Sequence, residues 1–143
     1  MDPKYDNELI ARLINYLMRM GKKTVAQKIV YGAINIISEK MSEEPVSIVT
    51  RAIDNIKPRV EVRSRRVGGS TYQVPIEINR DRQLALALRW LVQFSNQRKN
   101  VPMMEALAGE MMDAYNNQGN AVRRREDTHR MAQANKAFAH YAW

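Results

Sequence analysis

The stretch VEVRSRRVGGSTYQVPIEI, residues 60–78, decides how this chain folds. Val60 and Val62 alternate with polar residues, and after two glycines the apolar residues return at every second position as far as Ile78. A period of two is typical of β-strands, and adjacent glycines allow the chain to reverse sharply. The stretch therefore predicts an antiparallel β-hairpin over about residues 59–79.

The register of this hairpin can be predicted from the apolar positions, which have even numbers on both strands. Directly opposed residues of an antiparallel pair share a face, so an odd-length loop over residues 67–69 is expected. In this register Val62 faces Val74, and Arg59 lies across from Glu77. The ribbon is expected to be free-standing, which would leave the proline of its second strand at an edge.

Helical spacing of apolar residues dominates the rest of the chain. The first three expected helices run from Leu9 to a C-cap at Gly21, from Thr24 to Met41 and from Pro45 to Ile56. Two more run from Leu84 to Val92 and from Met104 to Tyr115, the second before a Gly119 stop. The last expected helix is polar, and its thin apolar side is Met131, Ala134 and Phe138. Thr24 and Gln27 have capping-box spacing, Pro45 suits a first helical position, and Trp90 is expected in the core. Lys22 and Lys23 would then lie in the turn before the second helix.

Charge is the unusual feature of the composition. The chain has a net charge of +8, and the basic residues concentrate in the segments 1–30, 57–82 and 120–143. Such a basic balance is typical of nucleic-acid-binding proteins. No cysteine is present, so disulfides and thiolate metal sites are excluded. No apolar run approaches the roughly 18 residues of a membrane span, and the start lacks signal-peptide order, so a soluble, non-secreted protein is expected.

Catalytic and metal-binding patterns are weak. Glu126, Asp127 and His129 lie close together in the sequence, but His140 would be about 16 Å further along a helix, too far to share an ion with His129. The segment GGST lacks the following Gly-Lys-Ser or Gly-Lys-Thr and the strand-to-helix context of a phosphate loop. We therefore expect no enzyme activity, no metal and no cofactor.

The hairpin is the best candidate for binding. Arg63, Arg65 and Arg66 lie within four residues, and the nearby Tyr72 could stack on a base or on an arginine. A purely solvated ribbon would not explain this concentration of arginine. For the run of residues 123–125, all arginine, simple solvation remains an alternative to RNA contact.

Two other classes of function compete with RNA binding. An architectural DNA-binding protein would need a wedge residue at the tip of the arm, and Val67 is small for that role. A protein-binding module could use Met103, Met104, Met111 and Met112 as an adaptable face, although core filling explains these methionines better. Neither class accounts for three separate basic segments.

Several longer motifs resemble the bacterial-type small-subunit ribosomal protein seven family. They are EVRSRRVGGSTYQVP, MGKKTVAQKIVY, LALRW and REDTHRMAQANKAFAHYAW, which together extend over nearly the whole chain. The resemblance implies a mainly α fold, a bundle of about six helices with a protruding two-stranded hairpin between helices three and four. It also implies a single rRNA-binding domain over residues 1–143.

The resemblance further implies a protein that acts by binding RNA, without catalysis. Its expected location is the cytoplasmic ribosome or an organellar ribosome. Family members bind the three-prime major domain of the small-subunit rRNA, nucleate assembly of the subunit head, lie near mRNA and exit-site tRNA, and neighbour ribosomal protein eleven. The free protein is expected to be a monomer.

Carried onto this sequence, the candidate rRNA contacts are Lys22, Lys23, Lys28, Arg59, Arg63, Arg65, Arg66, Tyr72, Arg80, Arg82, Arg123, Arg124, Arg125, Arg130 and Lys136. The residues expected near mRNA and exit-site tRNA are Val67, Gly68, Gly69, Ser70, His140, Tyr141 and Trp143.

The sequence departs from the family pattern at three places. A basic arm usually precedes the segment that begins at Asp2, and we expect its absence here to reduce RNA affinity. Ala142 stands where an arginine is common, and Asn79-Arg80 replaces a usual basic-proline pair after the hairpin.

Overall fold

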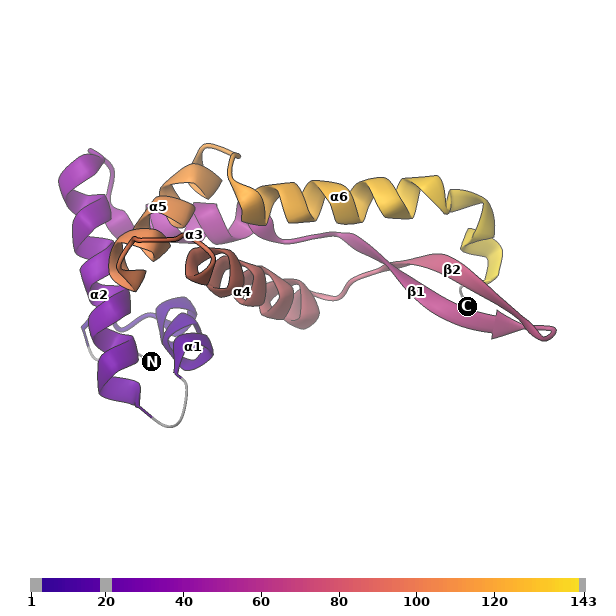
Figure 1. Ribbon diagram of the computed structural model, residues 1–143, viewed down its shortest axis with the longest axis horizontal. Helices are drawn as coiled ribbons and strands as arrows, with labels where there is room; N and C mark the ends of the chain where they lie inside the picture. Colours follow the sequence, from indigo (N-terminus) through magenta and orange to yellow (C-terminus); the bar gives the residue numbers. More distant parts are fainter. Residues whose placement is uncertain (1–3, 19–21, 142–143) are drawn as a thin grey trace.

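The computed structural model describes residues 4–18 and 22–141, with only the backbone for residues 140 and 141. Its elements are α1 (Glu8–Leu17), α2 (Lys23–Lys40), α3 (Pro45–Ile56), β1 (Val60–Val67), β2 (Ser70–Glu77), α4 (Arg80–Asn96), α5 (Met103–Tyr115), α6 (Asn120–Ala134) and a 3-10 helix, η1 (Lys136–Tyr141). Helices α1 to α5 gather at one end, and the hairpin and α6 extend away from them side by side (Figure 1). The expected mainly helical fold with a hairpin between helices three and four is confirmed.

The core lies among the gathered helices, where the predicted apolar stripes meet. Leu13, Ile34, Ile53 and Leu91 come from four different helices, and each is 0% exposed. Trp90 is buried as predicted, with 6% of its surface exposed. The helical periodicity therefore identified the core residues of these four helices correctly.

Local capping defines where several helices begin. The Asn7 side chain accepts the Ile10 N–H at 3.1 Å at the start of α1, and the Asn79 side chain accepts the Arg82 N–H at 3.0 Å at the start of α4. Pro45 is the first residue of α3, as predicted, and the Glu44 carboxylate caps that helix. These acceptors satisfy amide groups that have no partner within the first turn.

The predicted start of α2 was wrong. Helix α2 begins at Lys23, and its N-cap residue Lys22 makes no side-chain capping bond. Thr24 therefore lies inside the helix instead of capping it, and Lys23 is helical instead of part of the preceding turn. The predicted end of the first helix was also wrong, because α1 ends at Leu17 with Met18 as its C-cap. Gly21, the predicted C-cap, lies outside the described residues.

The methionines of α5 pack inward. Met111 is fully buried, and Met103 and Met112 pack against the core. Met104 lies over Gly32 of α2 so closely that a side chain at position 32 would overlap it. These contacts support the interpretation of the methionines as core filling.

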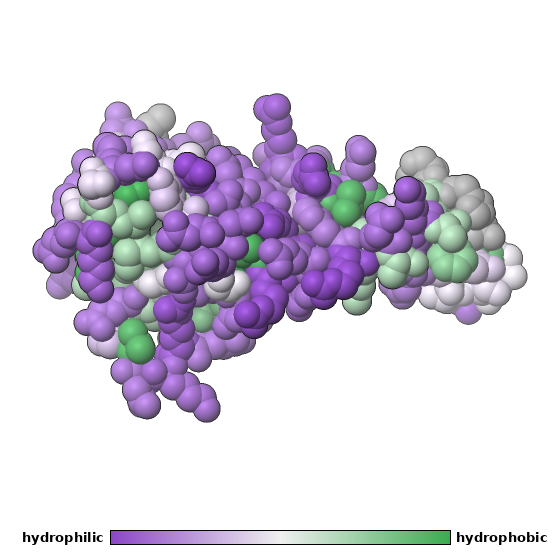
Figure 2. Space-filling view, turned by 90° about the horizontal axis from the view of Figure 1, so that it is seen from above, coloured by the Kyte–Doolittle hydropathy of each residue, from purple (hydrophilic) through white to green (hydrophobic). Residues whose placement is uncertain are grey.

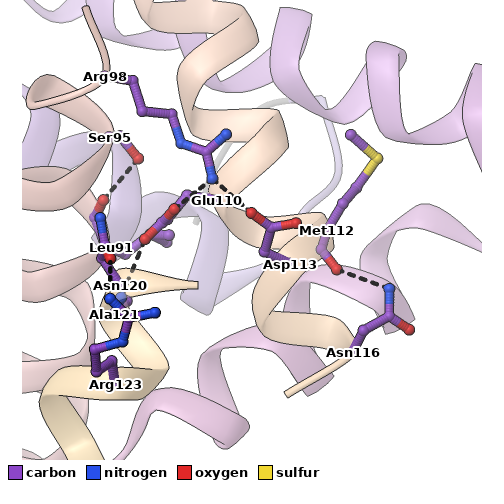
Figure 3. Close-up of polar contacts among 10 residues, drawn as sticks. All are labelled: Leu91, Ser95, Arg98, Glu110, Met112, Asp113, Asn116, Asn120, Ala121 and Arg123. Carbon is purple, nitrogen blue, oxygen red and sulfur yellow. Dashed lines mark hydrogen bonds and ion pairs between the residues drawn. The ribbon is translucent and has the colours of Figure 1, made fainter. Parts of the chain in front are cut away.

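Helix α6 is capped by a residue from another helix (Figure 3). Gly119 is its N-cap residue, with φ of 93°, and has no side chain to offer; the prediction that Gly119 ends the preceding helix was wrong. The Glu110 carboxylate of α5 accepts the Ala121 N–H at 3.0 Å and binds Arg98 at 2.6 Å. Arg98 also binds Asp113 at 2.7 Å, so one network joins α6 to the helical end of the molecule.

The inward face of α6 also differs from the prediction. Met131 is 61% exposed and Ala134 is exposed, whereas Ala121, Val122 and Ala132 are buried. Phe138 lies beyond α6 in η1, where its ring contacts that of Tyr72 at a centroid distance of 5.2 Å. Alanine and valine form the buried face because α6 lies close against α4 and the hairpin.

The predicted hairpin register was wrong by one residue. Val67 pairs with Ser70, so the loop has only two residues, Gly68 and Gly69, with φ of 58° and 84°. Two consecutive positive φ values are typical of the tight turn whose twist matches that of the strands. Consequently Val62 lies opposite Pro75 instead of Val74, and Glu77 lies opposite Val60 instead of Arg59.

The register inferred from the even-numbered apolar residues was wrong because the hairpin is not free-standing. Helix α6 contacts both strands and η1 contacts β2. Val74 is fully buried on one face, while Val60 and Val62 are half-buried on the other. Apolar residues therefore have partners on both faces, and their even numbering does not place them together.

Candidate nucleic-acid interface

The basic residues fall into regions with different surroundings. Most of the candidate contacts are exposed: Lys22, Lys23, Lys28, Arg59, Arg63, Arg66, Arg80, Arg123, Arg124, Arg130 and Lys136. Arg65, Tyr72, Arg82 and Arg125 are half-buried. The view onto the molecule from above is mainly hydrophilic, with only scattered hydrophobic residues (Figure 2).

The hairpin tip projects furthest from the helices (Figure 1). Gly68, Gly69 and Ser70 are exposed and Val67 is half-buried. A side chain added at either glycine would meet open space, so only the positive φ angles favour glycine here. Of the C-terminal residues expected near mRNA and tRNA, the side chains of His140 and Tyr141 and all of Trp143 lie outside the described part.

Glu61 is the centre of a charge network at the base of the arm. Its side chain is only 11% exposed, and Oε1 accepts Arg63 Nε at 2.7 Å and Arg82 Nε at 2.8 Å. A second bond of 3.0 Å joins Arg82 to Oε2. Burial alone would raise the pKa of Glu61, but the hydrogen bonds and charges of Arg82 and Arg63 hold it below its ordinary value.

Further along the arm the arginines diverge. Arg65 lies directly opposite Tyr72 and is half-buried, in keeping with the Tyr72–Phe138 packing against η1. Arg66 is exposed on the other face, opposite Thr71. Among the three arginines of this strand, Arg66 is thus presented directly to solvent, whereas Arg63 is oriented by Glu61.

The arginine run of α6 also divides by role. Arg125 is 19% exposed and donates to the Asn55 carbonyl at the end of α3. The Arg124 guanidinium lies over the Trp90 ring at 5.7 Å, close enough for a cation–π contact. The Arg123 side chain is exposed, and among the described hydrogen bonds it donates to the nearby Asn120 side chain. Arg125 therefore holds α6 in place, and Arg123 is the member best placed for a ligand.

His129 joins α6 to the start of the hairpin. Its Nε2 accepts the Arg59 backbone N–H at 2.9 Å, which requires that nitrogen to be unprotonated. Burial, and then the charges of Arg125 and Arg59, lower the pKa of His129 below its ordinary value. The sequence offered no direct signal for this bond, because the two residues are far apart in the chain.

A cleft of about 620 Å³ lies between the base of the hairpin, α4 and α6. Its lining includes Arg59, Glu77, Gln83, His129 and Lys136, so both charges and amides face it. Within residues 4–18 and 22–141, no three His, Cys, Asp or Glu side chains gather as a metal site would require. In the same described part, no helix combines the length and apolarity needed to cross a membrane.

Sequence reasoning did not place Glu61 among the site residues and named it only as a partner in an alternative, structural ion-pair network with the hairpin arginines, although a single acidic residue within an arginine-rich strand was a visible signal. The structure brings together Arg63 and Arg82, which are separated in the sequence by most of the hairpin. It leaves Lys22, Lys23 and Lys28 at the opposite end of the molecule, on α2 and the residue that precedes it.

A helical body, an extended basic arm and a basic helix beside that arm are features typical of a nucleic-acid-binding protein. The chain belongs to the family of ribosomal protein S7p/S5e, whose sequence model matches residues 1–136. It is 56% identical to the small ribosomal subunit protein uS7 of Geotalea daltonii over 142 residues, which is 99% of this chain and 91% of that protein. The uS7 proteins of Anaeromyxobacter sp. (strain Fw109-5) and Geobacter sulfurreducens are 55% and 54% identical over the same shares of each chain.

The family membership confirms the resemblance found in the sequence. The protein is a structural component of the small ribosomal subunit and not an enzyme.

Proposed function

We propose that this protein binds the three-prime major domain of the small-subunit rRNA and thereby helps to nucleate assembly of the subunit head. The observation that carries this proposal is the separation of its exposed cations between α2, the arm and α6. A folded RNA offers phosphate groups on several surfaces at once, whereas a single duplex groove would meet only one of these regions. Residues 1–143 would act together as one binding unit.

The arm is well suited to reach RNA beyond the helical body. Helix α6 and η1 contact the strands, so the cations of the arm are supported and need less ordering when they bind. Exposed Arg66 is offered near the tip, and Arg123, Arg130 and Lys136 line the supporting segment. This arrangement favours a stiff, two-sided basic projection.

The finer partners are also part of the proposal. The tip residues 67–70 and the C-terminal residues His140, Tyr141 and Trp143 would lie near mRNA and exit-site tRNA. Ribosomal protein eleven would be a neighbour in the subunit head. The free protein would be a monomer, because the face of the molecule that Figure 2 shows is mainly hydrophilic.

Salt dependence of binding tests the proposal. Each lost phosphate contact lowers the magnitude of the slope of log K against log salt by about 0.7 to 1 unit. We expect Arg66→Ala and Arg123→Ala each to show this loss with a transcript of the three-prime major domain. Lys99→Ala is the matched control, because Lys99 is exposed but lies outside the three basic segments.

The same titration with mixed-sequence duplex DNA separates RNA from DNA binding. Tighter binding to the transcript than to DNA at equal salt is expected. Equal affinities, or slopes unchanged by both arginine variants, would contradict the proposal.

A further inference from the structure

We propose that Arg63 and Arg82 form a phosphate-binding pair and that Glu61 is the residue that positions them. The inference rests on the proposed RNA-binding function and assigns a specific site within it. The pair joins β1 to the first turn of α4, so it lies at the base of the arm.

The geometry places the two guanidinium groups side by side. Both Nε atoms bind the same oxygen of Glu61, at 2.7 Å for Arg63 and 2.8 Å for Arg82. The distance between the two Nε atoms therefore cannot exceed the sum of these two hydrogen-bond lengths. Arg82 adds a second bond to the other carboxylate oxygen, which gives it the two-bond geometry that orients a guanidinium strongly.

The Glu61 carboxylate is largely buried, whereas the two guanidinium groups are exposed. The Glu61 side chain is 11% exposed, compared with 53% for Arg63 and 41% for Arg82. Among the described hydrogen bonds, the terminal amino groups of Arg63 and one of those of Arg82 have no acceptor. Two guanidinium groups around one carboxylate leave a net positive charge, so donors and charge remain for an external anion.

A phosphate group is the ligand that fits this arrangement. Its oxygens can accept from two adjacent guanidinium groups, and planar guanidinium forks match phosphate geometry. The chemistry of the pair does not distinguish an RNA phosphate from inorganic phosphate. In this protein the flanking arm and α6 carry further exposed cations, so the continuous RNA backbone is the source we assign.

The competing explanation is that the three residues only hold the hairpin against α4. The two explanations predict opposite changes in RNA affinity when Glu61 is removed. If Glu61 has no positioning role, deleting a negative charge near RNA strengthens binding. If Glu61 orients the arginines, deleting it weakens binding despite the more favourable net charge.

The experiment measures the affinity of the full chain for the three-prime major domain transcript over a range of salt concentrations. Glu61→Ala and Glu61→Gln are expected to weaken binding about tenfold, within the range of coupling seen for residues of one hydrogen-bond network. Glu77→Gln is the matched control, because Glu77 is an exposed carboxylate of the same hairpin, and unchanged or tighter binding is expected. Equal or tighter binding by both Glu61 variants overturns the proposal.

The double variant Arg63→Ala with Arg82→Ala completes the test. It should lower the magnitude of the salt slope by about 1.4 to 2 units, and adding Glu61→Ala should then weaken binding no further. A further loss in this background would show that Glu61 acts through the fold, and an unchanged slope would overturn the site even if the Glu61 variants unfold.

Thermal melting of every variant identifies any loss caused by unfolding. Inorganic phosphate added at the same ionic strength should compete if the pair binds free phosphate, and a lack of competition assigns the pair to the RNA backbone alone. If the Arg66 and Arg123 variants lose affinity for the transcript while the Glu61, Arg63 and Arg82 variants bind it as the wild type does, this inference fails and the proposed function stands. If the transcript itself binds no better than duplex DNA, the proposed function fails.

Discussion

Replacing Glu110 by Ala should destabilise the protein far more than the loss of one surface ion pair. Glu110 is 1% exposed, and its carboxylate both binds Arg98 at 2.6 Å and accepts the first-turn Ala121 N–H of α6 at 3.0 Å. A negative charge at a helix N-terminus also interacts favourably with the helix dipole. The substitution removes all three interactions together.

The magnitude follows from these contacts. Removing one partner of a buried ion pair costs about 3–5 kcal/mol, and losing a helix cap costs about 1 kcal/mol. Arg98 is 33% exposed and keeps its bond to Asp113, so the lower part of this range applies. We expect the free energy of unfolding to fall by about 3 kcal/mol, which for a chain of this length lowers the melting temperature by about 10 °C.

Urea unfolding and calorimetry measure this change, and Asp113→Ala is the matched control. Asp113 binds the same arginine but is 46% exposed, so we expect its loss to cost less than about 1 kcal/mol. Hydrogen exchange should also show faster opening at Ala121 in the Glu110 variant. A Glu110→Ala cost no larger than that of Asp113→Ala would refute the interpretation of Glu110 as a buried cap.

Three further predictions concern the core, the joint between α6 and the arm, and the turn. Trp90→Ala should lower the free energy of unfolding by about 3–5 kcal/mol in urea titrations, because Trp90 is 6% exposed; a neutral change would contradict its burial. The pKa of His129 is lower in the folded protein than its ordinary value of about 6.5 in the unfolded chain. The stability that neutral His129 contributes is therefore complete above about pH 6.5 and is lost as the pH falls from 6.5 to the folded-state pKa. Unfolding measured between about pH 8 and pH 5 should therefore show a decline that is smaller in His129→Ala, and identical profiles would exclude this role. Replacing Gly68 by Val should destabilise the turn by about 1–2 kcal/mol, whereas Gly68→Asn should be tolerated, as hydrogen exchange along β1 and β2 can show; equal effects would contradict the positive φ.

The helical part of this fold could be predicted well from the sequence. Leu13, Ile34 and Leu91 recur at helical spacing in their segments, and each lies in the core. Pro45 marked the start of α3. Spacing and helix-start signals act within a few residues, so local sequence contains most of the information that they need.

The candidate site could be predicted only as a set of residue types. The sequence indicated that Arg63, Arg82 and Arg125 are basic residues in basic segments, but it did not distinguish their roles. Arg125 became a tie to α3, and Arg63 and Arg82 became neighbours through Glu61. These differences depend on which distant segment each side chain meets.

By itself, the sequence determined the helical body, the presence and place of the hairpin, the positive charge and the family. The tertiary structure alone decided the hairpin register, the burial of Glu61 and the bond between His129 and Arg59. The physical reason is that an apolar period shows which residues can be buried together, provided that only one face of an element is covered. Once α6 and η1 contact the arm, long-range packing selects the register and orients the arginines.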